Sequence, residues 1–301
     1  MNVLIIGSSG FIGSYCYKHL VSKGYSVFCA DINSINSSHQ FYLLDPVKTD
    51  FDKIFKDTKF DICINASGAA SVPFSLENPI QDFILNTGNV VKILEAIRLF
   101  SPNCFLINFS SAAIYGNPIK LPVTESMKPK PMSPYGWHKY YAEQICKEYS
   151  HFFNIKTCNL RIFSAYGPGL KKQFFWDLFN KLQNKKELEL FGTGNESRDF
   201  IFVEDIAQSV ELIIENRFSL PDIINVASGD ETSIHEAAQI FNELVNKGNQ
   251  IRFSGKVRLG DPLNWKADIN ILRSIGFSPS HTLKKGLEKY KIWLQKEKKL
   301  D

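Results

Sequence analysis

The chain has 301 residues, a formal net charge of +4, 44% hydrophobic and 22% charged residues. This length suffices for a large core with a smaller second lobe, and the composition indicates an ordinary globular protein, with disorder expected only in the Lys/Glu-rich tail after Trp293. The positive charge is too thinly spread for nucleic-acid binding. No apolar stretch approaches the ~18 residues of a membrane span or forms a signal peptide, so we expect a soluble cytoplasmic protein.

Cysteine and histidine residues give no sign of a disulfide framework or a metal site. The six cysteines form no Cys-x-x-Cys pair and mostly fall within apolar patterns, as small buried side chains do in a reducing compartment. The six histidines are scattered without the spacing of metal ligands. We therefore expect no metal ion. We also expect no membrane partner, because the sequence has no apolar stretch long enough to span a bilayer.

The N-terminus predicts a strand, a glycine-rich turn, a helix and a second strand. Residues 2–6 read Asn-Val-Leu-Ile-Ile and residues 25–30 read Tyr-Ser-Val-Phe-Cys-Ala, so both are mostly apolar; between them, residues 7–13 read Gly-Ser-Ser-Gly-Phe-Ile-Gly and residues 14–22 are amphipathic. This order is typical of the first βαβ unit of a dinucleotide-binding domain.

Four residues of this unit suit a dinucleotide. Gly7 allows the tight turn, Gly10 lets the backbone approach a pyrophosphate at the helix N-terminus, and Gly13 lets the helix pack on the strand. Asp31, at the end of the second strand, would accept hydrogen bonds from the adenosine ribose and repel a 2′-phosphate. No arginine lies between Asp31 and Asp45, so NAD(H) is favoured over NADP(H); the alternative for Asp31 is a loop carboxylate facing water.

Strands and helices alternate after Asp31. We predict strands at residues 41–44, 61–65, 104–109 and 157–162, and helices at residues 50–57, 79–99 and 134–152. From about residue 166 the rhythm changes, with helices at residues 170–184, 204–216 and 233–246 and strand-like segments at residues 187–191, 199–203 and 222–227.

This pattern predicts an α/β fold with a Rossmann-type doubly wound parallel sheet. We expect residues 1–165 to form the dinucleotide-binding domain, which also receives about residues 199–227. Residues 166–301 would form a smaller, interleaved substrate-binding lobe. A ligand should lie in the crevice at the carboxyl ends of the strands.

Tyr135 and Lys139 lie four residues apart, and Ser111 precedes Tyr135 by 24 residues. Positions i and i+4 share one face of a helix, so the ammonium should lie near the phenol. A neighbouring cation lowers the pKa of a tyrosine from its usual ~10 and gives an acid/base usable near neutral pH. Such pairs also occur by chance on surface helices, but here the glycine-rich unit accompanies the pair.

These features resemble the extended short-chain dehydrogenase/reductase family, which contains nucleotide-sugar epimerases, dehydratases and reductases. The resemblance covers nearly the whole chain and includes residues 65–72, 75–79, 109–116, 160–169, 192–201 and 258–262, with Asn86 and Ala267-Asp268. It implies that Ser111 hydrogen-bonds the reacting C4 oxygen, that Tyr135 exchanges its proton, and that Lys139 holds the nicotinamide ribose.

The resemblance also implies two sets of binding residues. The cofactor set is Gly7, Gly10, Phe11, Ile12, Gly13, Asp31, Asp45, Pro46, Ala66, Ser67, Gly68, Asn86, Tyr135, Lys139 and Phe163. The substrate set is Ser71, Val72, Ser75, Ser111, Ser164, Arg198 and Arg258. The two arginines match those that grip the diphosphate of a sugar nucleotide. Ser164 stands where the family usually has asparagine. For Ala66, Gly68 and Phe163 the alternative role is packing. For the two arginines it is a surface salt bridge.

Missing residues narrow the reaction to C4 of the sugar. Ala112 and Ala113 replace the Asp-Glu pair of a 4,6-dehydratase, and Ala113 and Gly169 replace the cysteine and histidine of a 3,5-epimerase/4-reductase. We favour NAD(H)-dependent reduction of a nucleoside-diphosphate 4-keto-6-deoxyhexose, for example dTDP-4-dehydro-6-deoxyglucose, for surface-polysaccharide precursors, because 301 residues is short for the related 4-epimerases.

Two other functions stay open. One is an NAD-retaining nucleotide-sugar 4-epimerase, since residues 111–116 resemble those of UDP-galactose 4-epimerase. The other is a non-catalytic nucleotide-binding protein, which the presence of both Tyr135 and Lys139 disfavours. The family's helices after Pro79 and Pro134 pair across a two-fold axis, so we expect a homodimer.

Overall fold

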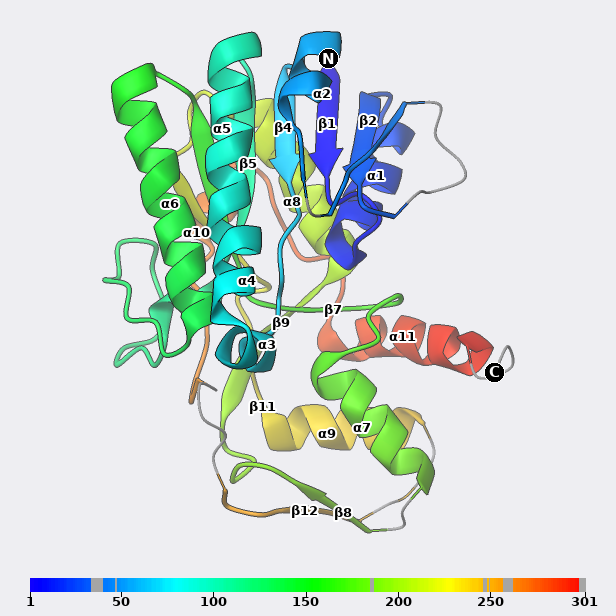
Figure 1. Cartoon of the computed structure of the whole chain (residues 1–301). Helices are drawn as coiled ribbons and strands as arrows, with labels where there is room; N and C mark the ends of the chain where they lie inside the picture. Colours follow the sequence, from blue (N-terminus) through cyan, green and yellow to red (C-terminus); the bar gives the residue numbers. More distant parts are fainter. Residues whose placement is uncertain are drawn as a thin grey trace.

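The computed structural model describes residues 1–33, 40–46, 48–184, 187–245, 248, 250–256 and 262–297. A parallel sheet with helices on both faces forms the larger part of the molecule, and a smaller group of helices and short strands packs beyond one end of it (Figure 1). Arg258 lies outside the described residues.

The central sheet has seven parallel strands in the order β10-β6-β5-β4-β1-β2-β3. Its strands are β1 (Asn2–Ile6), β2 (Ser26–Asp31), β3 (Phe41–Leu43), β4 (Ile62–Asn65), β5 (Phe105–Ser111), β6 (Thr157–Ile162) and β10 (Ile223–Val226). Strands such as β4 and β6 are buried along their whole length, as expected for a parallel sheet covered on both faces. Strand order reverses between β1 and β4, which places a ligand crevice at their carboxyl ends.

Helices cover both faces of this sheet. On one face pack α2 (Asp52–Asp57), α5 (Asn89–Phe100) and α6 (Pro134–Phe153). On the other pack α1 (Phe11–Ser22) and α8 (Val203–Asn216), with the short α10 (Asn270–Ser274) beside β10. The apolar stripe of each helix, with buried residues three and four positions apart, supplies the core on its side.

The segment before α5 departs from the prediction of one helix over residues 79–99. The structure has α4 (Pro79–Phe83), a π-helical turn η1 (Ile84–Gly88) and then α5, preceded by a short helix α3 (Val72–Glu77). In the π-turn the backbone is wider than in an α-helix, a feature that is frequent at functional sites. Asn86 and Thr87 on this turn are buried.

Among its described residues, the smaller lobe contains two short sheets and three helices. Strands β7 (Ser164–Tyr166), β9 (Ser197–Phe202) and β11 (Glu231–Ser233) form one sheet, and β8 (Glu187–Leu190) and β12 (Gln250–Phe253) form the other. Helices α7 (Gln173–Asn184), α9 (Ile234–Leu244) and α11 (Leu283–Glu297) enclose a core of aromatic and leucine side chains.

The predicted α/β fold with a doubly wound parallel sheet is confirmed, and all six cysteines are buried, as predicted. The short strands β7, β11 and β12 and the helix α3 were not predicted. Helices of the described residues lack the combination of length and apolar content that a bilayer span requires.

Candidate active site

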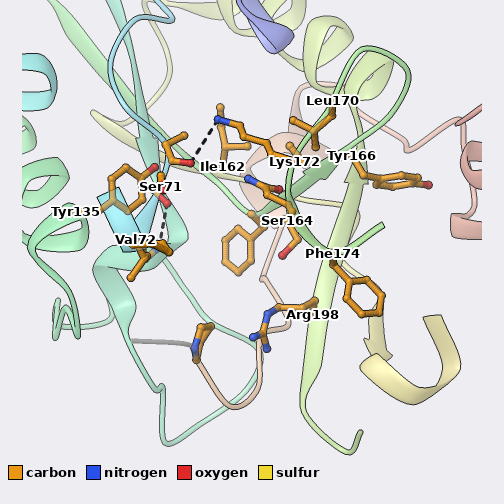
Figure 2. A pocket seen from close by; sticks show the side chains of 18 of the residues that line it. Ser71, Val72, Tyr135, Ile162, Ser164, Tyr166, Leu170, Lys172, Phe174 and Arg198 are labelled. Carbon is orange, nitrogen blue, oxygen red and sulfur yellow. Dashed lines mark hydrogen bonds between the residues drawn. The ribbon is translucent and has the colours of Figure 1, made fainter. Parts of the chain in front are cut away.

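A cavity of about 880 Å³ lies between the carboxyl ends of the central strands and the smaller lobe. It brings together most of the predicted site residues: Gly10, Phe11, Ile12, Ala66, Ser67, Gly68, Ser71, Val72, Ser111, Tyr135, Lys139, Phe163, Ser164 and Arg198. In Figure 2, Tyr135, Ser71 and Val72 lie on one side of this cavity, with Lys172, Phe174 and Arg198 across from them.

The glycine turn presses the start of α1 against the sheet. Gly7 has a φ of +84°, and a Cβ on Gly13 would lie 2.1 Å from the Gly7 carbonyl oxygen. Gly10 precedes the first residue of α1, lines the cavity and leaves the helix without a side-chain cap. The unpaired N–H groups of that helix end form a site for an anionic group such as a pyrophosphate.

Asp31 is 8% exposed and does not face water. Its carboxylate accepts hydrogen bonds from the backbone N–H groups of Ser9 at 2.8 Å and Asn33 at 3.2 Å, so it holds the glycine turn against the end of β2. Asp45 and Pro46 are exposed beyond β3, where the Asp45 carboxylate accepts from the Lys48 N–H at 2.9 Å. Neither residue is part of the cavity wall.

Ser111, Tyr135 and Lys139 meet where β5 ends and α6 begins. Ser133 caps α6 by accepting from the Gly136 N–H at 3.2 Å, which fixes the first turn that carries Tyr135. The phenol and the ammonium are both buried, at 9% and 6% exposure. Lys139 Nζ donates to the Phe109 carbonyl oxygen at 2.9 Å.

Burial sets the protonation of both side chains. It raises the pKa of Tyr135 to about 12, against the opposing effect of a hydrogen bond with Ser111, and the charge of Asp82 adds to the rise. Burial also lowers the pKa of Lys139 to about 8. The prediction that the pKa of Tyr135 is lowered is therefore wrong for the chain alone, because burial is the largest influence on the phenol and raises its pKa.

The loop after β4 is held by a row of buried amides. The Ser67 N–H and hydroxyl both donate to Asn65 Oδ1, and Asn65 donates in turn to Asn108, which donates to Asn159. These asparagines occupy matching positions on β4, β5 and β6. The row fixes Ser67 at the cavity wall.

Gly68 follows in this loop and lies against the buried Asn86. It has a φ of +110°, and a Cβ there would lie 2.5 Å from Asn86 Oδ1. Asn86 therefore sits directly behind the cavity wall. The sequence placed both residues in the cofactor site, and only Gly68 lines the cavity.

The predicted sugar-facing serines differ in position. Ser71 lines the cavity and caps α3 by accepting from the Phe74 N–H at 3.2 Å. Ser75 is fully buried, and its hydroxyl donates to the Val72 carbonyl oxygen at 2.7 Å. Ser75 thus stabilises α3 from within, while Val72 itself lines the cavity.

Arg198 reaches the cavity from β9. Its Nη1 donates to the Ser197 and Leu263 carbonyl oxygens at 2.8 and 3.3 Å, and its guanidinium lies 5.6 Å from the centre of the Trp265 ring. Trp265 is itself fixed by a hydrogen bond from Nε1 to the Gly116 carbonyl oxygen at 3.0 Å.

Sequence reasoning missed Trp265, Lys172 and Phe174 as wall residues. Trp265 lies between two segments of the family resemblance, residues 258–262 and 267–268, and this position was the signal that could have identified it. Lys172 and Phe174 were assigned to a helix over residues 170–184, but α7 begins at Gln173, whose φ is +68°. Lys172 Nζ contacts the Ala70 carbonyl oxygen at 3.5 Å across the cavity.

Comparison with known proteins gives consistent matches. A family model described as the NAD dependent epimerase/dehydratase family matches residues 3–227. A putative UDP-glucose 4-epimerase of Methanocaldococcus jannaschii is 29% identical over 97% of this chain and 98% of its own length.

Two solved structures superpose along nearly the whole chain. The UDP-N-acetylglucosamine 4-epimerase from Methanobrevibacter ruminantium, in complex with UDP-N-acetylmuramic acid, has a TM-score of 0.87 and 26% identity and covers 98% of each chain. The UDP-glucuronic acid 4-epimerase from Bacillus cereus, in complex with UDP-glucuronic acid and NAD, has a TM-score of 0.87 and 25% identity, covering 99% of this chain and all of the other.

Proposed function

The chain belongs to the NAD dependent epimerase/dehydratase family, and from that premise we propose that it is an NAD-retaining 4-epimerase of a UDP-sugar. The relatives described above are all 4-epimerases by description. The 4-ketoreductase favoured from chain length has no support among them. Length was a poor guide, because the M. jannaschii relative aligns over 98% of its own length with this chain.

One observation carries the proposal. The cavity joins a glycine turn suited to a dinucleotide with Ser111, Tyr135 and Lys139 in a single wall. A binding protein would need the turn alone, whereas a C4 epimerase needs a proton-exchanging group beside the cofactor.

The residues present fit NAD. The turn leaves no room for a side chain at Gly7 or Gly13, and the uncapped start of α1 offers N–H groups to a pyrophosphate. Asp31, Ser67 and Lys139 would hold the cofactor's hydroxyl and amide groups. When bound, NAD would supply a reversible hydride acceptor for C4 of the sugar.

The side chains around the reacting carbon handle the proton. We assign to Tyr135 the removal of the proton from the C4 hydroxyl and its return after the sugar has turned over, and to Ser111 a hydrogen bond to the same oxygen. The Lys139 ammonium, with its pKa of about 8, stays largely protonated at neutral pH. Its charge favours the tyrosinate, which burial alone disfavours.

We assign the substrate's diphosphate to Arg198 and, from the sequence, Arg258. A planar guanidinium satisfies phosphate oxygens in a bidentate manner. Ser164, which also lines the cavity, is shorter than the asparagine usual in the family and leaves more room beside the phosphates. Ser71 and Val72 would border the sugar.

Several sequence-based assignments remain part of the proposal. Residues 1–165, with about residues 199–227, would bind the cofactor, and the remaining residues would bind the substrate. The enzyme would act in the cytoplasm. Its product would serve as a precursor of polysaccharides. We also propose a homodimer, because exposed apolar side chains gather on α4, η1, α5 and α6: Ile80, Phe83, Ile84, Val91, Trp137 and Tyr141.

The test of function uses purified protein with UDP-glucose, UDP-N-acetylglucosamine and UDP-glucuronic acid in turn, without added cofactor. We expect one of these to yield its C4 epimer, and denatured protein to release NAD. Consumption of added NADH by a 4-keto-6-deoxy sugar nucleotide, without any epimerisation, would instead establish the reductase.

A further inference from the structure

A buried carboxylate lies behind the catalytic pair. Asp82 on α4 is fully buried, and its Oδ2 lies 2.6 Å from Nδ1 of His138. His138 is on α6, between Tyr135 and Lys139 in the sequence. Since α4 and α6 lie side by side (Figure 1), the pair ties the helix that carries the catalytic residues to the segment leading into η1.

The surroundings of His138 leave little water near this pair. The histidine side chain is 11% exposed, and its ring is covered by Phe83 at 5.4 Å and Tyr141 at 6.4 Å between ring centres. A buried carboxylate needs a hydrogen-bond donor on each oxygen to offset its lost hydration. His138 supplies one of these donors to Asp82.

Asn86 supplies the other donor, and this fixes the orientation of its amide. Asn86 Nδ2 donates to Asp82 Oδ1 at 3.1 Å. A carboxylate only accepts hydrogen bonds, so the amide nitrogen must face Asp82 and the amide oxygen must face away. That oxygen lies against Gly68 of the cavity wall.

The amide oxygen of Asn86 lacks a hydrogen-bond partner within the described part of the chain, although it is buried. Buried acceptors without partners are rare, and each calls for a ligand or another explanation. The oxygen sits on a π-helical turn, where α-helical geometry is given up. The oxygen lies behind Gly68, which carries no side chain, so a group bound in the cavity against this glycine is the nearest ligand that could supply the missing donor.

We propose that Asp82, held by His138, is a positioning residue that orients the Asn86 amide so that its oxygen accepts a hydrogen bond from bound NAD. The donor on the cofactor is a hydroxyl or carboxamide N–H group. The inference rests on the proposed function only for the identity of the ligand, and its test is binding rather than turnover.

The experiment measures NAD affinity of protein stripped of cofactor, by titration calorimetry. In Asp82→Asn the new side chain offers an N–H, so the Asn86 amide can turn over and present its nitrogen to the cavity. We expect NAD affinity to fall about tenfold in Asp82→Asn and in Asn86→Ala, and to fall no further in the double variant.

Glu95→Gln is the matched control. Glu95 on α5 binds Arg98 and accepts a hydrogen bond from Tyr149 of α6 at 3.2 Å, so it links neighbouring helices away from the cavity. Its removal should leave NAD affinity unchanged. An unchanged affinity in Asp82→Asn, or additive losses in the double variant, would overturn the proposal.

His138 provides a second test that leaves Asp82 in place. His138→Gln keeps a side-chain N–H donor for Asp82, whereas His138→Leu does not. We expect a severalfold loss of NAD affinity in the leucine variant and near-normal affinity in the glutamine variant. Equal affinities in the two, or a lowered melting temperature with unchanged affinity, would show a purely structural pair. If the variants show this coupling in NAD binding but the protein epimerises none of the UDP-sugars, the proposed function is refuted and the positioning role of Asp82 stands.

Discussion

Desolvation of Tyr135 and Lys139 is the main electrostatic feature of the site. The i and i+4 spacing predicted that the two side chains share a helix face, and both line the cavity. It did not predict their pKa values of about 12 and 8. Burial depends on how β5 and η1 pack against α6, which the spacing within one helix does not contain.

Replacing Tyr135 with phenylalanine tests the proton-exchange role. The ring still fills its place, so the fold should be unchanged and NAD should still bind, while epimerisation should fall at least about 10³-fold. Product formation followed by NMR and thermal denaturation measure the two effects. Turnover close to that of the wild type would remove Tyr135 from the mechanism.

Replacing Lys139 with methionine tests the cost of the buried ammonium. The pKa of Lys139 is about 8 in the folded chain, against an ordinary lysine value of 10.5, so charge burial destabilises the fold below pH 8. This penalty is relieved as the pH rises from 8 to 10.5, where only the unfolded state stays protonated.

In cofactor-free protein we therefore expect Lys139→Met to raise the free energy of unfolding at pH 7, by at most roughly 3 kcal/mol. The advantage should shrink toward pH 10, and activity should be lost. Urea denaturation of the variant and the wild type at the two pH values measures this difference in the free energy of unfolding. A variant that is less stable than the wild type at pH 7 would show that the ammonium is well compensated.

At the scale of elements, the contact between the glycine turn and α1 offers the sharpest test. In Gly13→Ala the methyl group would meet the Gly7 carbonyl oxygen at 2.1 Å and force the helix away from β1. We expect a loss of about 1–3 kcal/mol in stability and a large loss of NAD affinity.

Gly88→Ala is the control for this substitution. A Cβ on Gly88 would have no neighbour within 4 Å, and its backbone is helical. Stability should be unchanged or slightly raised. Equal destabilisation by both substitutions, measured by urea denaturation, would argue against the close helix–strand contact.

The sequence predicted most elements of the central sheet because their apolar runs and glycine or proline boundaries are local signals. The division of residues 79–99 into α4, η1 and α5 was not predicted, since the π-turn depends on tertiary contacts of Asn86 and Thr87. Strands β11 and β12 were missed because they are only three and four residues long and contain no continuous apolar run.

At the scale of the whole molecule, the cavity draws on both the sheet and the smaller lobe. Residues matched by motif line the cavity where the motif follows a central strand, as for Ser67 and Ser111. Lys172 and Trp265 line the cavity because the smaller lobe packs against the central sheet, and a local sequence pattern does not predict this packing. Chain length does not separate a reductase from an epimerase, because a putative UDP-glucose 4-epimerase aligns with this chain over 98% of its own length.

The exposed apolar side chains on α4 and α6 carry the prediction of a dimer. Phe83 and Trp137 are each 43% exposed, and burying them against a second copy would remove this area from water. Phe83→Asp combined with Trp137→Glu should yield a monomer in sedimentation velocity. Phe218→Glu, at a site 81% exposed beyond α8, should leave the dimer intact; a monomeric wild type would contradict the proposal.

The most direct test of the catalytic account is epimerisation in D₂O, followed by proton NMR of the C4 hydrogen. If Tyr135 exchanges only the hydroxyl proton while the carbon-bound hydrogen leaves and returns within the closed site, the product should keep protium at C4. No reduced cofactor should need to be added. Deuterium at C4 of the epimerised sugar, or a strict requirement for added NADH, would contradict the account.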